Sequence, residues 1–248
     1  MPTLLLSILL CTCVPALLSA QDAQALIDRV IDAVGGTDAL HRLEDVQFVY
    51  HRADGSSSLE RYCFGKEISY GRTRGDDGHV REEYYNGVTT TLLIDGQLVT
   101  DATEKERARF RRKTNFYWLA MMHKLDDPGT EYDYAGTDTL NGTAYQLVDV
   151  TFEEGIGDAR DRYRLYINPE TDLVDRFLYT VAGADRLQPT LMVVEYDSFE
   201  GGVQLPVESR SHPVSDWSGD PVAGAAWRVS RRQDFRFHNG FTPETIRQ

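Results

Sequence analysis

Cysteine is scarce in this chain of 248 residues, which contains three. Two of them, Cys11 and Cys13, lie in an apolar N-terminal segment, so removal of that segment leaves Cys63 alone. A single thiol excludes an internal disulfide, and the fold must then depend on its hydrophobic core. A chain of more than two hundred residues can supply such a core. Cys63 falls in a strand pattern, where we expect a small buried hydrophobe rather than a nucleophile.

Motifs of catalysis are also missing. The chain has no nucleophile elbow of the G-x-S-x-G type, no H-E-x-x-H and no P-loop. The segment Gly155–Arg160 begins like a dinucleotide-binding fingerprint but lacks the third glycine and a following helix. We therefore predict no catalytic residue, no cofactor and no metal, because the six histidines are scattered without the spacing of ligands: His41, His51, His79, His123, His212 and His238.

One enzymatic alternative stays open. Acidic pairs such as Glu153 with Glu154, or Asp158 with Asp161, are of the residue type that a secreted glycosidase uses as acid and base. The separation of their carboxyl groups decides that chemistry, and a sequence does not give it. A hydrolase needs at least two such groups facing each other in a cleft, whereas a carrier needs an apolar lining.

Basic residues are outnumbered, 26 against 39 acidic ones, which gives a formal net charge of −13. Lysine is rare among the basic residues. We exclude nucleic acid as a partner, since phosphate binding requires positively charged faces. An acidic surface is typical of a solvated, soluble protein.

The first twenty residues have the layout of a secretory signal peptide. An apolar run from Leu4 to Val14 is broken by Pro15, and Leu18-Ser19-Ala20 supplies small residues before Gln21. We predict cleavage after Ala20 and export, with a single mature domain over residues 21–248. No basic residue precedes the run, so an uncleaved anchor or a different start is the alternative. Lipidation at Cys11 or Cys13 is another, although neither follows a small residue.

After a short helix, the spacing of apolar residues in the mature chain changes from helical to alternating. Helical spacing of Ile27, Val30, Ile31 and Val34 predicts a helix that ends at Gly35-Gly36, with Thr37 capping a short turn through Leu43. Alternating segments joined by turns such as Asp95-Gly96 and Asn141-Gly142 then predict an antiparallel meander. The expected strands include residues 46–51, 59–70, 79–85, 89–94, 97–100, 131–139, 143–152, 163–167, 173–181, 191–199, 205–212 and 227–237.

Several strands are apolar on both faces, for example around Val148 and Met192, so both faces are covered or one lines a cavity. The last strand differs, because its polar row is expected to face solvent: Arg228, Ser230, Arg232, Asp234 and Arg236.

One amphipathic segment, 103–125, interrupts the strands. Thr103 and Glu106 form a predicted capping box, and Thr114-Asn115 offers a point where the helix could divide. A basic run from Arg107 to Lys113 is expected to be a solvated face, with an anionic headgroup site as the sharper alternative. An apolar stripe follows that is either plain core or a lid over an apolar pocket: Trp118, Met121, Met122 and Leu125.

Three stretches carry a family resemblance. Residues 166–174 and 196–206, together with the helix ending in Val34-Gly35-Gly36, resemble the LolA/LolB-like lipoprotein-carrier superfamily. Residues 115–129 resemble a secreted bacterial family of unknown function beside it. The resemblance implies a mostly β fold with α, an antiparallel incomplete (half) β-barrel wrapped around a few helices. It also implies an apolar cavity for acyl chains and a place in the periplasm, or at the outer membrane, of a Gram-negative bacterium.

Two hypotheses therefore stand. The first is a non-enzymatic binding protein for a lipid, an acyl chain or a lipoprotein, with peripheral contact to the envelope membrane. The second is the secreted hydrolase. For the first, we predict ligand contacts from the central helix and from inward strand residues: Trp118, Met121, Met122, Leu125, Phe116, Phe48 and Tyr50.

Overall fold

The computed structural model describes residues 17–153, 161–181 and 186–248. Its main feature is a 13-stranded sheet in which every neighbouring pair is antiparallel. The strands are β1 (Asp45–His51), β2 (Ser57–Cys63), β3 (Ile68–Arg74), β4 (Val80–Tyr85), β5 (Thr90–Ile94), β6 (Gln97–Leu98), β7 (Thr130–Leu140), β8 (Thr143–Phe152), β9 (Tyr163–Ile167), β10 (Val174–Val181), β11 (Arg186–Ser198), β12 (Gln204–Pro213) and β13 (Arg228–Phe237).

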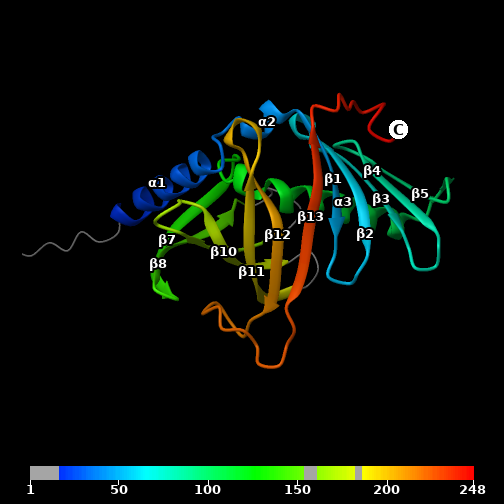
Figure 1. Cartoon of the computed structure of the whole chain (residues 1–248). Coiled ribbons are helices and arrows are strands. Elements are labelled where there is room, and N and C mark those ends of the chain that lie inside the picture. Colours follow the sequence, from blue (N-terminus) through cyan, green and yellow to red (C-terminus); the bar gives the residue numbers. More distant parts are fainter. Residues whose placement is uncertain (1–16, 154–160, 182–185) are drawn as a thin grey trace, which may run out of the picture.

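The strand order explains where the central helix lies. The sheet runs β6-β5-β4-β3-β2-β1-β13-β12-β11-β10-β9-β8-β7, so its two free edges, β6 and β7, are consecutive in the chain. Helix α3 (Ala102–Ala120) connects these edges and crosses behind the central strands in the view of Figure 1. The sheet is therefore an open half-barrel wrapped around a helix, as expected from the sequence.

The remaining helical segments also lie against the sheet. Helix α1 (Leu17–Ala33) packs on β7, and the short α2 (Ala39–Leu43) follows it. A 3-10 turn, η2 (Met121–His123), continues α3. Among the described residues, no helix is both long and apolar enough to span a bilayer.

The turns form where the sequence predicts them. Asp95 and Gly96 both adopt positive φ, as do Asn141 and Gly142. These angles are those of two-residue hairpin turns that match the twist of the flanking strands. The predicted end of α1 is confirmed as well, because Gly36 donates its N–H to the carbonyl of Ile31 at 2.8 Å with φ of 87°.

Two local predictions are wrong, and a third point that the sequence left open is decided. The expected strand 59–70 is two strands, since a 3-10 turn at Phe64–Lys66 (η1) reverses the chain, with Glu67 in the left-handed region. Helix α3 is capped by Asp101, whose carboxylate accepts the N–H of Glu104, and not by Thr103. The helix also runs unbroken through residues 114–115, because no proline or glycine interrupts it.

The apolar core is divided among both faces of the sheet. The largest cluster joins α1, η2 and the inner faces of β8 to β11, and a second joins α2, the end of α3 and β1. On the outer face of β8 to β11, Val214 is buried in a third cluster against which Trp217 packs. Strands apolar on both faces are thus explained, because a loop covers one face while helices occupy the other.

Candidate functional site

A central cavity of about 510 Å³ lies between α3 and η2 on one side and strands β1 and β10 to β13 on the other. Its volume is within the range of about 300–1,000 Å³ that is usual for small-molecule sites. We call it the central cavity throughout. Its lining divides into an apolar wall and a polar wall, which come from different elements.

The apolar wall comes from the helical segment and from β10 and β11. Trp118 stacks on Phe177 with ring centroids 5.9 Å apart and meets Tyr179 edge-on at 4.8 Å. Methionines contribute to this wall from both η2 and β11, and methionine adapts its shape to irregular partners. Its members are Trp118, Leu119, Met121, Met122, Phe177, Tyr179, Met192, Val194 and Tyr196.

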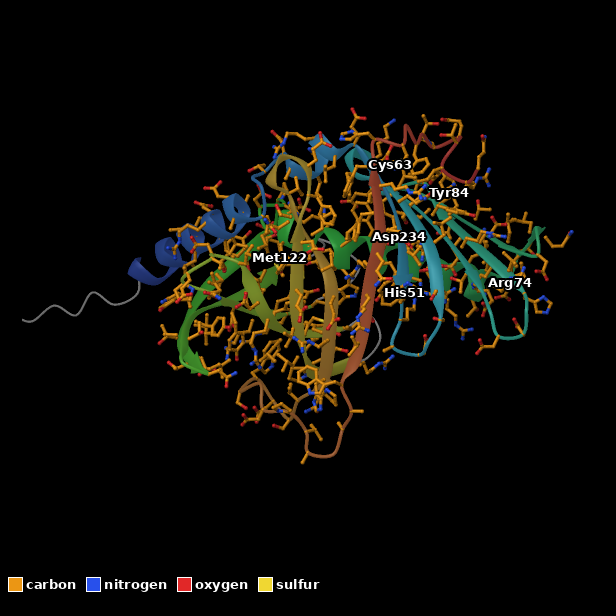
Figure 2. The ribbon with its side chains drawn as sticks, in the orientation of Figure 1. His51, Cys63, Arg74, Tyr84, Met122 and Asp234 are labelled. Carbon is orange, nitrogen blue, oxygen red and sulfur yellow. The ribbon has the colours of Figure 1, made fainter. Side chains whose placement is uncertain are left out.

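The polar wall corrects the interpretation of the last strand. Arg232 is buried and Ser230 is half-buried against the central cavity, whereas Arg228 also lines the cavity but remains exposed. The cause is Asp234, which adopts a φ of 59° opposite a break in the β1–β13 register and adds one residue to the alternation. Beyond this bulge, labelled by Asp234 in Figure 2, Phe235 and Phe237 turn inward instead.

Arg232 is buried, with 5% of its surface exposed. Its Nη1 donates to the carbonyl of Pro206 at 3.2 Å and to the Ser209 hydroxyl at 3.3 Å. Its guanidinium lies over the Tyr50 ring, 5.0 Å from the centroid, and that of Arg52 lies 4.8 Å from the same centroid. Arg52 also donates to Glu60 at 3.3 Å.

His123 of η2 completes one end of the cavity and is also buried. Its Nε2 donates to the carbonyl of Gln204 at 2.9 Å, while its buried Nδ1 has no partner in the described part of the chain. Burial lowers the pKa of His123, against the hydrogen bond to Gln204 and the charge of Asp126. The ring is therefore held neutral beside the ligand space.

A side cavity of about 210 Å³ lies on the other flank of α3. Trp118 lines both cavities, so its indole forms part of the partition between them. Phe116, Tyr117, Phe152 and Tyr163 give the side cavity an apolar lining, with Lys124 and Glu67 at its edge.

The seven residues predicted from sequence separate into three groups. Tyr50, Trp118, Met121 and Met122 line the central cavity. Phe116 lines the side cavity. Leu125 and Phe48 line neither and are packed in the core, where Phe48 stacks on Phe235 at 5.2 Å.

Sequence reasoning missed the polar residues of β12 and β13. Ser209 and Ser211 of β12 line the central cavity. In the sequence, two alternating serines look like the solvent-facing side of a strand. No local signal separates an inward polar wall from an outward one. The sequence gives one indication of the reversal in β13, which is Asp234, because aspartate tolerates the positive φ that this bulge requires.

The basic run of α3 is neutralised by carboxylates of this chain. Arg107 pairs with Glu104 on the helix surface. Arg112 is instead fully buried beneath the helix, between Glu60 and Glu83, so it does not belong to a solvated face. Burial raises the pKa of Glu83, but the Arg111 hydrogen bond and the Arg112 charge outweigh it and hold that pKa below its ordinary value.

Cys63 is half-buried beneath the C-terminal segment, and its Sγ lies 3.5 Å from the carbonyl of Phe241. Burial raises the pKa of Cys63 to about 11, with the Asp45 charge adding to it. The thiol is thus protonated at neutral pH and packs as the sequence predicts.

The acidic pairs of the hydrolase alternative are not placed by the structure. Glu154 and Asp158 lie outside the described residues, as does the segment Gly155–Arg160, and so do Cys11 and Cys13. Within the described lining of the central cavity, Asp54 is the only carboxylate. Across the described ranges, no three His, Cys, Asp or Glu side chains gather as they would around a metal ion.

Comparison with known proteins finds a sequence match over part of the chain and matches in shape over nearly all of it. The model of a family of unknown function, DUF6503, matches residues 99–195. This segment contains α3 and the strands β7 to β10. No curated protein matches the chain.

Solved structures match nearly the whole chain in shape. A LolA superfamily protein from Nitrosomonas europaea has a TM-score of 0.52 at 9% identity, covering 92% of this chain and 97% of its own. A DUF1329 family protein from Desulfovibrio piger reaches 0.52 at 16%, covering 89% and 95%. A domain described as a candidate outer membrane lipoprotein-sorting protein from Vibrio parahaemolyticus reaches 0.50 at 6%, covering 92% and 97%. The chain therefore has the LolA-like fold.

Proposed function

We propose that the protein is a non-enzymatic carrier or sensor that holds a lipid, an acyl chain or the acyl part of a lipoprotein in its central cavity. The observation that carries this proposal is the apolar wall of a cavity of about 510 Å³ inside an open half-barrel. Burying apolar ligand surface there contributes about 25 cal/mol per Å². The lipoprotein-sorting description of the Vibrio parahaemolyticus domain agrees with this class of ligand.

The proposal includes a location outside the cytoplasm. Cleavage after Ala20 would fall within the first turn of α1, which begins at Leu17. The helix residues whose burial is described begin at Ala23, and their buried stripe would be kept. The intact mass of protein from the envelope of a native host should show a mature start at Gln21. A retained leader, or the mass of a diacylated Cys13, would contradict export in this form.

Binding of a neutral apolar fluorophore tests the cavity itself. N-phenyl-1-naphthylamine should bind with enhanced emission, and Trp118→Asp should weaken its affinity by tenfold or more, since a charge would replace the apolar wall. Met192→Trp fills the same space without adding a charge and should reduce binding too. Val88→Asp is the matched control, because Val88 is 80% exposed and is not part of the cavity lining.

Thermal melting separates the carrier from plain core packing. If the wild type binds no apolar fluorophore while Trp118→Asp unfolds the protein, the stripe of α3 is core alone. The carrier function then loses its support.

A further inference from the structure

The central cavity is electropositive in a strongly acidic protein. The chain has a net charge of −13, yet the described lining of this cavity contains three arginines and one aspartate: Arg52, Arg228, Arg232 and Asp54. Arg52 pairs with Glu60, as Arg107 and Arg109 of α3 pair with glutamates of their own helix. Arg228 and Arg232 have no carboxylate partner among the described residues. The positive charge is thus a feature of this cavity wall and not of the chain as a whole.

Arg232 is the least compensated of these cations. It is 5% exposed, and its protein partners within the described residues are a carbonyl, a hydroxyl and the Tyr50 ring, with no carboxylate. Both of its recorded hydrogen bonds come from Nη1, so Nε and Nη2 donate to no described protein group. A buried charge is costly unless it is paired, and buried guanidinium groups in proteins normally have an anionic partner.

The neighbours of Arg232 gather further donors at the same wall. Arg52 and Arg232 both lie within 5.0 Å of the Tyr50 ring centroid, so both guanidinium groups contact the same ring in the cavity wall. Arg228 and Ser230 precede Arg232 on the same face of β13 and also line the cavity, with Arg228 still exposed to solvent. A planar guanidinium binds carboxylate and phosphate oxygens through two parallel hydrogen bonds, which a hydroxyl group does not match.

We infer that the central cavity binds amphiphiles with an anionic headgroup, a carboxylate or a phosphate, which Arg232 holds together with Arg52 and Arg228. The acyl chain lies along the apolar wall of Trp118, Met122 and Met192. This inference rests on the proposed function and names its ligand class. The segregation of a polar wall on β12 and β13 from an apolar wall on α3 and β11 fits a ligand with one charged end.

A structural role for Arg232 is the competing explanation. Its bonds to Pro206 and Ser209 fasten β13 to β12, so its loss could lower stability without affecting any ligand. The two roles differ in one readout. If Arg232 only joins β13 to β12, its removal does not alter the preference for a charged over an uncharged headgroup. If Arg232 binds the headgroup, its removal alters that preference.

The test is displacement of N-phenyl-1-naphthylamine from the full chain by three ligands with the same alkyl length, decanoate, decyl phosphate and decanol. The wild type should prefer each anion to decanol by tenfold or more. Arg232→Met should abolish this preference and keep the affinity for decanol. Arg236→Met, which removes the same charge from the outward face of β13, should leave the preference intact.

Each outcome decides the question. Equal affinity of the wild type for decanol and the anions, or an unchanged preference in Arg232→Met, overturns the headgroup site while the carrier function stands. No binding of the fluorophore or of any decyl compound overturns both. If Arg232→Met does not fold, Arg228→Met replaces it, and an unchanged preference there overturns the inference. Inorganic phosphate that raises the melting temperature as much as decyl phosphate would instead show a site for the free anion.

Discussion

Arg112 brings a positive charge beneath α3, where 2% of its side chain is exposed. It bonds to Glu60 and, at 3.2 Å, to Glu83. The backbone beside it is equally constrained, because a Cβ added at Gly71 would lie 2.1 Å from Nη1 of Arg112. Glycine is needed at this strand position for close approach, not for its backbone angles.

Removal of Arg112 should therefore be costly. Arg112→Met removes the buried cation between Glu60 and Glu83, whose remaining partners, Arg52, Arg81 and Arg111, are all more exposed than Arg112. We expect a loss of about 3–5 kcal/mol in the free energy of unfolding. Urea denaturation measures it. Arg107→Met on the exposed face of the same helix should cost less than about 1 kcal/mol.

A triple variant tests the cause. Adding Glu60→Gln and Glu83→Gln to Arg112→Met removes the two buried carboxylate charges that Arg112 compensates and should recover part of the loss. If Arg112→Met costs no more than Arg107→Met, the buried charge network does not stabilise the fold.

Two histidines should contribute to the pH dependence of stability with opposite signs. The pKa of His123 is lowered by burial, so below its ordinary value near 6.5 the unfolded chain takes up a proton first and stability falls. The pKa of His79 is raised by its hydrogen bond and charge interaction with Asp95, so that contribution is complete below pH 6.5 and is lost as pH rises.

Urea midpoints at pH 5.5 and 7.5 measure both effects. His123→Gln should reduce the loss of stability on acidification, while His79→Gln should increase it. If the urea midpoint changes equally between the two pH values in the wild type and in His123→Gln, the buried His123 ring is not held in its neutral form.

At the scale of elements, α3 is held in two ways. Its first half is fixed by ion pairs to β2 and β4, and its last turns by apolar packing on the strands. The start of the helix is set by Asp101, whose Oδ1 accepts the Glu104 N–H at 2.8 Å.

We predict that Asp101→Ala costs about 1 kcal/mol, within the usual range of about 0.5–2 for a lost cap. Thr103→Ala should have an effect below about 0.5 kcal/mol, because Thr103 is exposed and caps nothing. Chemical denaturation of the two variants side by side measures the difference. A larger effect at Thr103 would contradict the assignment of the cap.

The elements also show what sequence can and cannot predict. Hairpins such as the one at Asn141-Gly142 were predicted because their turn residues need positive φ. The turn at Phe64–Lys66 was missed because Phe64 continues the apolar alternation. The inward Arg232 was missed because one bulge at Asp234 reverses the alternation of β13, and a single aspartate gives little sign of it.

For the whole molecule, the decisive contact is between the first and last strands. β1 pairs with β13 and so joins the meander β1–β6 to the meander β7–β13. No local pattern predicts this pair, because its partners are separated by nearly the entire chain. The cavity depends on it, since Tyr50 on β1 and Arg232 on β13 form one wall.

We therefore expect the two meanders to unfold together. Phe48 of β1 is 1% exposed and stacks on Phe235 of β13 at 5.2 Å. Phe48→Ala should cost about 3–5 kcal/mol. It should shift the tryptophan fluorescence transition, which reports Trp118 of α3 together with Trp217 and Trp227 between β12 and β13, as much as the far-UV circular dichroism transition. Val88→Ala, at a position 80% exposed, should leave both unchanged. Separate transitions, or a fluorescence midpoint that Phe48→Ala does not move, would show that the meanders fold independently and that β1–β13 pairing is not what encloses the cavity.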